Sequence, residues 1–157
     1  MITVTIDTSD LTRKFADFPL ALAYAHRKAQ HKALEYIGQR VASEATRAFK
    51  TASLRPSPWA PRKDKKATHP LLIKHPAGGL WKSISYRLED SDTVVVGSDK
   101  EYAGYHQHGT KNMPARPFFP IDEDGQLTPR IMRKIKADVE AAYKEELDKV
   151  FGNGGGG

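Results

Sequence analysis

The chain contains no cysteine among its 157 residues. Disulfide bridges, thiolate metal ligands and cysteine nucleophiles are therefore excluded. Apolar runs are short, and none approaches the roughly 18 residues that a membrane-spanning helix needs. The opening residues, MITVTIDTSD, have neither the basic start nor the apolar centre of a signal peptide. We therefore expect a soluble intracellular protein with no membrane partner.

The composition is nevertheless that of a folded protein, with 39% hydrophobic and 28% charged residues. A chain of this length suits one domain with a single core, and we assign residues 1–151 to it. The glycine-rich end, residues 152–157, has no side chains to bury and is expected to be disordered.

Positive charge is concentrated in one stretch of the chain. The whole chain carries a net charge of +6, and the segment from Arg55 to Lys74 alone carries +5, offset only by Asp64. Such a patch indicates an anionic neighbour, either nucleic acid or an acidic protein face. Its basic residues are Arg55, Arg62, Lys63, Lys65, Lys66 and Lys74.

Periodicity predicts two long helices. Apolar residues three or four apart predict an amphipathic helix along the stripe Leu22, Ala25, Ala29, Ala33, Ile37, Val41, Ala45 and Phe49. The opposite face is expected to be polar, with His26, Lys28, His31, Lys32, Glu35, Gln39 and Glu44. The alanine stripe fits either a sheet of the same chain or a second subunit. Thr128 and Pro129 predict the start of a second amphipathic helix, and Gly152 predicts its end.

Short strands are predicted around these helices. Alternation predicts one over residues 2–6 and a hairpin of residues 80–88 and 93–97 joined by a polar turn. Residues 102–109 fit either a helical turn or a short strand. Residues 116–121 contain Pro117 and Pro120, so they fit only an edge strand or an extended segment. The sequence therefore predicts an α+β fold, with a small antiparallel sheet packed by the long N-terminal helix and the C-terminal helix.

Residues 51–79 have no such periodicity. Five prolines, at positions 56, 58, 61, 70 and 76, exclude a continuous helix or an inner strand. We expect a long, basic, flexible loop, with Trp59 as its one large apolar anchor. Two interpretations stay open: a solvated loop whose lysines keep it soluble, or an arm that becomes ordered on a partner.

Catalytic and metal-binding patterns are weak. His106 and His108 would share one face of a strand, but a catalytic zinc usually has three protein ligands and no third is evident. The acidic residues Glu89, Asp90, Asp92 and Asp99 stand at predicted turns, where carboxylates are common. No phosphate-binding loop is present. We expect no enzymatic activity, no metal and no cofactor.

An ordered series of motifs is more specific. Trp59-Ala60-Pro61 comes first, then GxLxxS at Gly79, Leu80 and Ser83, and then a Val94–Gly97 strand. YAxxHxxG follows at Tyr102, Ala103, His106 and Gly109, and PARPF at Pro114, Ala115, Arg116, Pro117 and Phe118. This series, over residues 15–150, resembles the phage virion morphogenesis family, the tail-completion group that includes the phage Mu G protein. It also looks related to head–tail joining proteins of HK97-type phages.

The resemblance implies a non-enzymatic assembly protein that is a virion component and is assembled in the bacterial cytoplasm. It implies a homo-oligomeric ring around the DNA axis that docks to neck, tail or connector proteins. The alanine-rich helix and the RPFFP segment are candidate halves of the ring contact. Phe118 and Phe119 would either anchor a neighbour or fill the core, and Arg116 would pair with a carboxylate of the fold.

The basic loop admits a second function. Lining a DNA channel, it would contact phosphates through a salt-sensitive, sequence-independent attraction. The alternative to the assembly role is a stand-alone nucleic-acid-binding module that uses the arm of residues 55–74. Trp59 is the only aromatic residue of that arm, and no base-reading motif accompanies it.

A triple substitution tests whether the lysines of this loop support the fold. Changing Lys63, Lys65 and Lys66 together to Gln should alter the free energy of unfolding by less than about 1 kcal/mol, because exposed cations contribute little to stability. Thermal melting of both proteins measures this difference. A collapse of the melting temperature in the variant would contradict the interpretation of the segment as a solvated arm.

Overall fold

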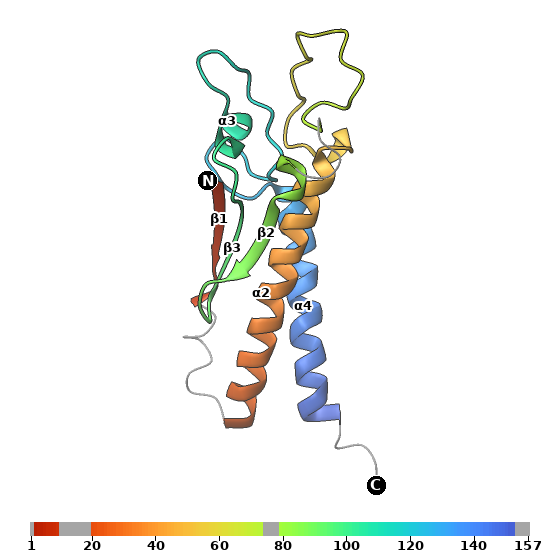
Figure 1. The fold of residues 1–157 in the computed structure, drawn as a ribbon. Helices are drawn as coiled ribbons and strands as arrows, with labels where there is room; N and C mark the ends of the chain where they lie inside the picture. Colours follow the sequence, from red (N-terminus) through yellow and green to blue (C-terminus); the bar gives the residue numbers. More distant parts are fainter. Residues whose placement is uncertain (1, 10–19, 74–78, 153–157) are drawn as a thin grey trace.

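The computed structural model describes residues 2–9, 20–73 and 79–152 (Figure 1). Its α+β architecture confirms the predicted fold class. The elements are β1 (Ile2–Asp7), α2 (Leu20–Ala48), the 3₁₀ turns η1 (Ala52–Leu54) and η2 (Leu80–Lys82), β2 (Ile84–Leu88), β3 (Thr93–Ser98), α3 (Ala103–His108) and α4 (Pro129–Phe151). The expectations for Lys74 and for residues 153–157 lie outside the described residues.

The sheet has three strands in the order β1-β3-β2. Both outer strands are antiparallel to β3, so β1 and β2 run parallel to each other. Thr5 and Arg87 lie opposite Val95 from its two sides, and Val4 and Tyr86 lie in the same way opposite Val96. Val94 and Val96 point to the helix side and are fully buried.

The second strand begins later than the alternation predicts. Leu80 is in a 3₁₀ turn, because the Ser83 hydroxyl donates a hydrogen bond of 2.7 Å to the Leu80 carbonyl and closes the chain locally. Leu80 is buried in the core, and the strand starts at Ile84. Residues 103–108 take the helical one of the two predicted alternatives.

Helix α2 lies between the sheet and α4 (Figure 1), with β2 and β3 on one side and α4 along another. Close approach to the sheet depends on Gly38. A Cβ atom there would lie 2.7 Å from Cγ of Tyr86 and 2.9 Å from Cγ2 of Val94. The glycine therefore allows the tyrosine ring to pack directly on the helix backbone.

The alanine stripe is used within the chain. Ala29 and Ala45 are fully buried and Ala33 is 4% exposed, and α4 places Ile131, Ile135 and Ala142 in the buried interior. Of the two alternatives for this stripe, packing within the same chain accounts for these buried residues.

Some residues predicted on the polar face of α2 are also buried. His26 and Glu44 are each 4% exposed. His26 Nδ1 lies 2.9 Å from the Tyr143 hydroxyl, and Glu44 pairs with Arg130 at 2.5 Å and Lys134 at 3.0 Å. The prediction failed because both the sheet and α4 cover α2, whereas a single polar face requires that only one layer covers the helix.

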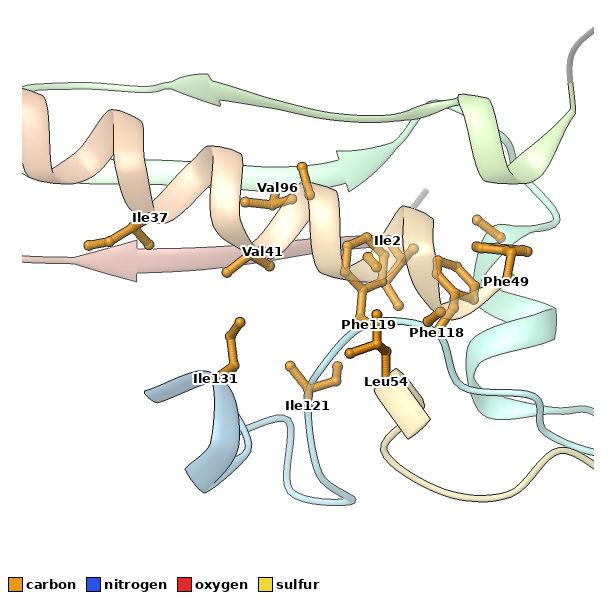
Figure 2. Packing of buried hydrophobic residues seen from close by; sticks show 14 of the residues in the cluster. Ile2, Ile37, Val41, Phe49, Leu54, Val96, Phe118, Phe119, Ile121 and Ile131 are labelled. Carbon is orange, nitrogen blue, oxygen red and sulfur yellow. The ribbon is translucent and has the colours of Figure 1, made fainter. Parts of the chain in front are cut away.

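The core is centred where α2 ends. Phe49, Phe118 and Phe119 gather there with Ile121 and other aliphatic side chains, as Figure 2 shows. The ring centroids of Phe49 and Phe118 are 5.0 Å apart, and those of Phe118 and Phe119 are 4.9 Å apart. Both phenylalanines of RPFFP are fully buried, so they fill the core and cannot anchor a neighbour.

Two glycines provide a matched test of this packing. Gly38→Ala should destabilise the protein by about 1–3 kcal/mol, because the added methyl collides with the Tyr86 ring and with the fully buried Val94 side chain. Gly104→Ala, where a Cβ atom meets nothing within 4 Å, should leave stability unchanged within about 1 kcal/mol. Urea unfolding of the two variants measures the difference. Equal stability would show that Tyr86 and Val94 do not pack as described.

Candidate interaction surface

The motif YAxxHxxG folds into α3 and the turn that ends it. Ala103 is fully buried, so its small side chain lets the helix approach the core. Gly109 ends the helix with a φ of 74°, and a Cβ atom there would lie 2.7 Å from the Ala115 nitrogen. Both the left-handed backbone and the close approach require glycine.

The motif PARPF is tied to α3 by hydrogen bonds. The Arg116 backbone N–H donates to the His106 carbonyl at 2.7 Å. The side-chain oxygen of Gln107, which is 5% exposed, accepts from the N–H groups of Phe118 and Phe119 at 2.9 and 3.0 Å. A segment that forms no strand thus has its polar backbone groups satisfied, as a buried segment requires.

Arg116 then connects this segment to the basic loop. Its guanidinium donates to the carbonyl of Ala60 at 3.0 Å and to that of Pro61 at 3.1 Å. The expectation that Arg116 pairs with a carboxylate is wrong: the side chain is 8% exposed, and its guanidinium binds backbone carbonyls. In the other direction, Trp59 Nε1 donates to the Pro117 carbonyl at 2.6 Å. We call this set of contacts the 59–117 clasp.

The clasp is extended by Arg55. Its guanidinium carbon lies 3.8 Å from the centroid of the Trp59 ring, and its Nε donates to the Ala48 carbonyl at 2.8 Å. A cation at the last carbonyls of α2 also complements the helix dipole. Phe49 meets the Trp59 ring edge-on at a centroid distance of 5.6 Å.

The basic loop is therefore not uniformly free. Arg55 caps α2, and Arg62 donates to the carbonyls of Ala67 and His69 within the loop. Lys63, Lys65 and Lys66 are exposed. Three cations of the arm, among the described residues, thus remain directed to solvent for a partner.

The GxLxxS motif supports the same end of the molecule. Gly79 has a φ of 99°, which favours glycine, and Leu80 is buried. The Ser83 hydroxyl lies 2.6 Å from that of Ser98, joining η2 to the end of β3. Beside it, Lys50 and Lys82 lie 4.6 and 5.1 Å from the centroid of the Trp81 ring.

The two histidines do not share one face of a strand, as the sequence predicted. They are on a helix and not on a strand, so His106 is half-buried whereas His108 is exposed. Burial, assisted by the charge of Arg116, lowers the pKa of His106. Across the residues that the structure describes, no group of three or more His, Asp or Glu side chains is placed to hold a metal ion.

The predicted acidic cluster has a structural role in part. Asp92, in the turn between β2 and β3, accepts a hydrogen bond from the Gln30 amide at 2.5 Å. Gln30 also donates to the Thr8 hydroxyl at 3.0 Å, so one α2 side chain joins the residue after β1 to the hairpin. Periodicity gave no signal for this link, because it depends on contacts between distant segments.

Other residues have large apolar side chains that are exposed to solvent. Tyr102, which directly precedes α3, and Tyr105 of α3 are 42% and 58% exposed. At the opposite end of the helix pair, Leu20 and Phe151 are 81% and 64% exposed. Tyr102 belongs to a motif, but sequence reasoning did not identify Tyr105, Leu20 or Phe151 as candidate contact residues.

These features define a small α+β protein in which most motif residues hold loops and core together. Comparison with protein families matches residues 14–138, about four fifths of the chain, to the phage virion morphogenesis family. The chain therefore belongs to the phage virion morphogenesis family, and its role lies in the assembly of phage particles. The resemblance found in the sequence is confirmed.

A curated relative agrees with this assignment. The Mu-like prophage FluMu G protein 1 of Haemophilus influenzae is 40% identical over 60 residues, which are 38% of this chain and 41% of the relative. The match thus spans about two fifths of the length of that relative. No solved structure matches the chain. None of the described helices combines the length and apolar character needed to cross a membrane.

Replacing one side chain of the clasp should loosen the basic loop. Arg116→Lys should cost about 2–3 kcal/mol, because an ammonium group cannot reproduce the fork that reaches two carbonyls. Trypsin should then cut faster at Lys63, Lys65 and Lys66. Arg133→Lys, on the exposed side of α4, is the matched control and should change neither urea stability nor cleavage. Unchanged cleavage in the Arg116 variant would contradict the clasp.

Proposed function

We propose that this protein completes the phage tail or joins it to the head, as a ring of identical copies that docks to neck or tail proteins. The observation that carries the proposal is the family match over residues 14–138. The name of the Haemophilus influenzae relative, a prophage G protein, supports a role among the same class of virion parts. Ring assembly would take place in the bacterial cytoplasm, and the product would remain in the virion.

The exposed apolar side chains support contacts at both ends. Tyr102 and Tyr105 are at the end that carries α3, and Leu20 and Phe151 are at the far end of the α2–α4 pair (Figure 1). Aromatic side chains are enriched in protein interfaces, because they bury a large area at low entropic cost. A part that stands between two neighbours needs such a surface on each end.

Charge distinguishes the two ends. Residues 47–73, 79–83 and 99–130 contain twelve Lys and Arg against six Asp and Glu, so this end carries the whole net charge of the chain. A basic end attracts an anionic surface, either DNA passing along the particle axis or an acidic face of a neighbouring protein. We propose the acidic protein face as the main partner, because Arg55, Arg62 and Arg116 are engaged within the chain.

The second candidate function is nucleic-acid binding by the arm of residues 55–74. The exposed Lys63, Lys65 and Lys66 favour it, since three neighbouring cations contact phosphates without reading bases. Filter binding of duplex DNA at two salt concentrations separates the candidates. Micromolar binding by an isolated monomer at physiological salt would favour the module over the assembly role.

A deletion in a prophage that encodes this chain tests the assembly role. Induced cells should accumulate heads and tails that do not form infectious particles, as counted by plaque titre and electron microscopy. The wild-type gene supplied in trans should restore the titre. Tyr102→Ser with Tyr105→Ser should lower it at least tenfold without a change in melting temperature.

The control for the tyrosines is Met132→Ser on α4. Met132 is 47% exposed, similar to the tyrosines, but it belongs to α4 and not to α3 or its motif. The Met132→Ser variant should restore the full titre to the deletion strain. Normal infectious particles from the deletion strain would overturn the proposed function, whereas full titre from the tyrosine variant would overturn only the contact assigned to α3.

A further inference from the structure

In the part of the chain that the structure describes, each outer strand of the sheet has one edge with no neighbouring strand. Among the described residues, β1 and β2 each pair with β3 alone. An edge strand presents unpaired N–H and C=O groups at alternate residues, and these groups can bind a further strand. A three-stranded sheet with two such edges has unused hydrogen-bonding capacity on both sides.

Neither edge carries the usual protection. Proteins guard edge strands with proline, lysine or bulges. Neither β1 nor β2 contains proline or lysine, and their pairing with β3 is continuous, residue by residue. The single cation, Arg87, lies 3.4 Å from Glu89 of its own turn. Apart from the charges of Asp7 and Arg87, the two strands have no residue that disfavours another strand beside them.

The two edges also match each other. β1 and β2 run in the same direction and at the same level, since Ile2 and Ile84 both face Ser98 and Ile6 and Leu88 both face Val94. Each strand alternates apolar and polar residues in the same phase. The helix side has Ile2, Val4 and Ile6 on β1, and Ile84, Tyr86 and Leu88 on β2.

The helix-side residues at these edges are incompletely covered. Val4 and Ile6 are partly exposed, and Tyr86 is 39% exposed although it packs on Gly38. If β1 of one copy lay beside β2 of the next in the same direction, apolar residues would meet apolar residues. Thr3 and Thr5 would lie in the row of Ser85 and Arg87, on the polar side.

We propose that copies of this chain join edge to edge, with β1 of one copy added in parallel to β2 of the next. The inference rests on the proposed self-association and names the surfaces that perform it. The contact is head-to-tail, because two different edges meet, so every copy keeps one free edge of each kind. Such an interface closes into a ring when its rotation permits. Main-chain hydrogen bonds would supply the affinity. The pairs of apolar residues on the helix side would set the register of the two strands.

The absence of cysteine makes this arrangement testable by disulfide trapping. Within one copy, Thr5 and Arg87 flank Val95 and are therefore two strand spacings apart, roughly 9.6 Å. A disulfide needs Cα atoms within about 7 Å, so Thr5→Cys with Arg87→Cys cannot close inside a copy. Between copies in the proposed register, the same positions are one spacing apart, about 4.8 Å.

The experiment supplies cysteine variants to the deletion prophage and oxidises the particles formed. Arg87→Cys is combined in turn with Thr3→Cys, Thr5→Cys and Asp7→Cys, so that a stagger of two residues is also detected. Non-reducing gels should show a ladder of multimers for one of the three pairs, ending at the ring size. The control, Arg87→Cys with Lys136→Cys on the exposed side of α4, should give no ladder.

The outcomes separate this inference from the proposed function. A ladder from an edge pair and none from the control supports edge-to-edge joining. Infectious particles with no ladder from any edge pair would overturn this inference and leave the assembly role intact. An equal ladder from the control would overturn it also, since it would show random collision. Failure of the proposed function is recognised by a different result, namely infectious particles from the deletion strain.

Discussion

The end of the molecule that carries α3 and the basic loop depends on the hydrogen bonds of the buried Arg116 guanidinium. It joins two segments that are 56 residues apart, and neither has regular secondary structure. A charged group that is 8% exposed is costly unless polar atoms surround it. Two backbone carbonyls meet that need, and with Trp59 they fix the loop on the core. The position of the exposed lysines and of α3 follows from this attachment.

Periodic features of the fold could be predicted from the sequence, whereas features that join distant segments could not. The stripe of α2 and the alternation of β1 are local patterns, so they predict the bounds of both elements to within a few residues. The burial of His26 and Glu44 requires knowledge that α4 covers a second side of α2. The carbonyl partners of Arg116 are equally non-local, because any residue contributes the same backbone oxygen.

The motifs that carried the family resemblance describe a scaffold more than a contact surface. Trp59, Leu80, Ala103, Arg116 and Phe118 act inside the protein, in the clasp or in the core. Tyr102 is the motif residue with a large exposed side chain. Residues that contact other virion parts must therefore be sought mainly outside the motifs, on edges and ends that no local pattern distinguishes.

The proposed contacts use different parts of this scaffold. The strands run roughly along α2, so edge-to-edge joining would act sideways, while the basic end and the helix tips point along the long axis (Figure 1). A ring built through β1 and β2 would therefore leave both ends of every copy open. All basic ends would lie on one rim, because head-to-tail copies share one orientation. Charge that is weak on a single copy would add up around that rim, since like patches at fixed spacing act together on one partner. The ring would thus bind an anionic neighbour more strongly than the free chain, without any change in the fold of the subunit.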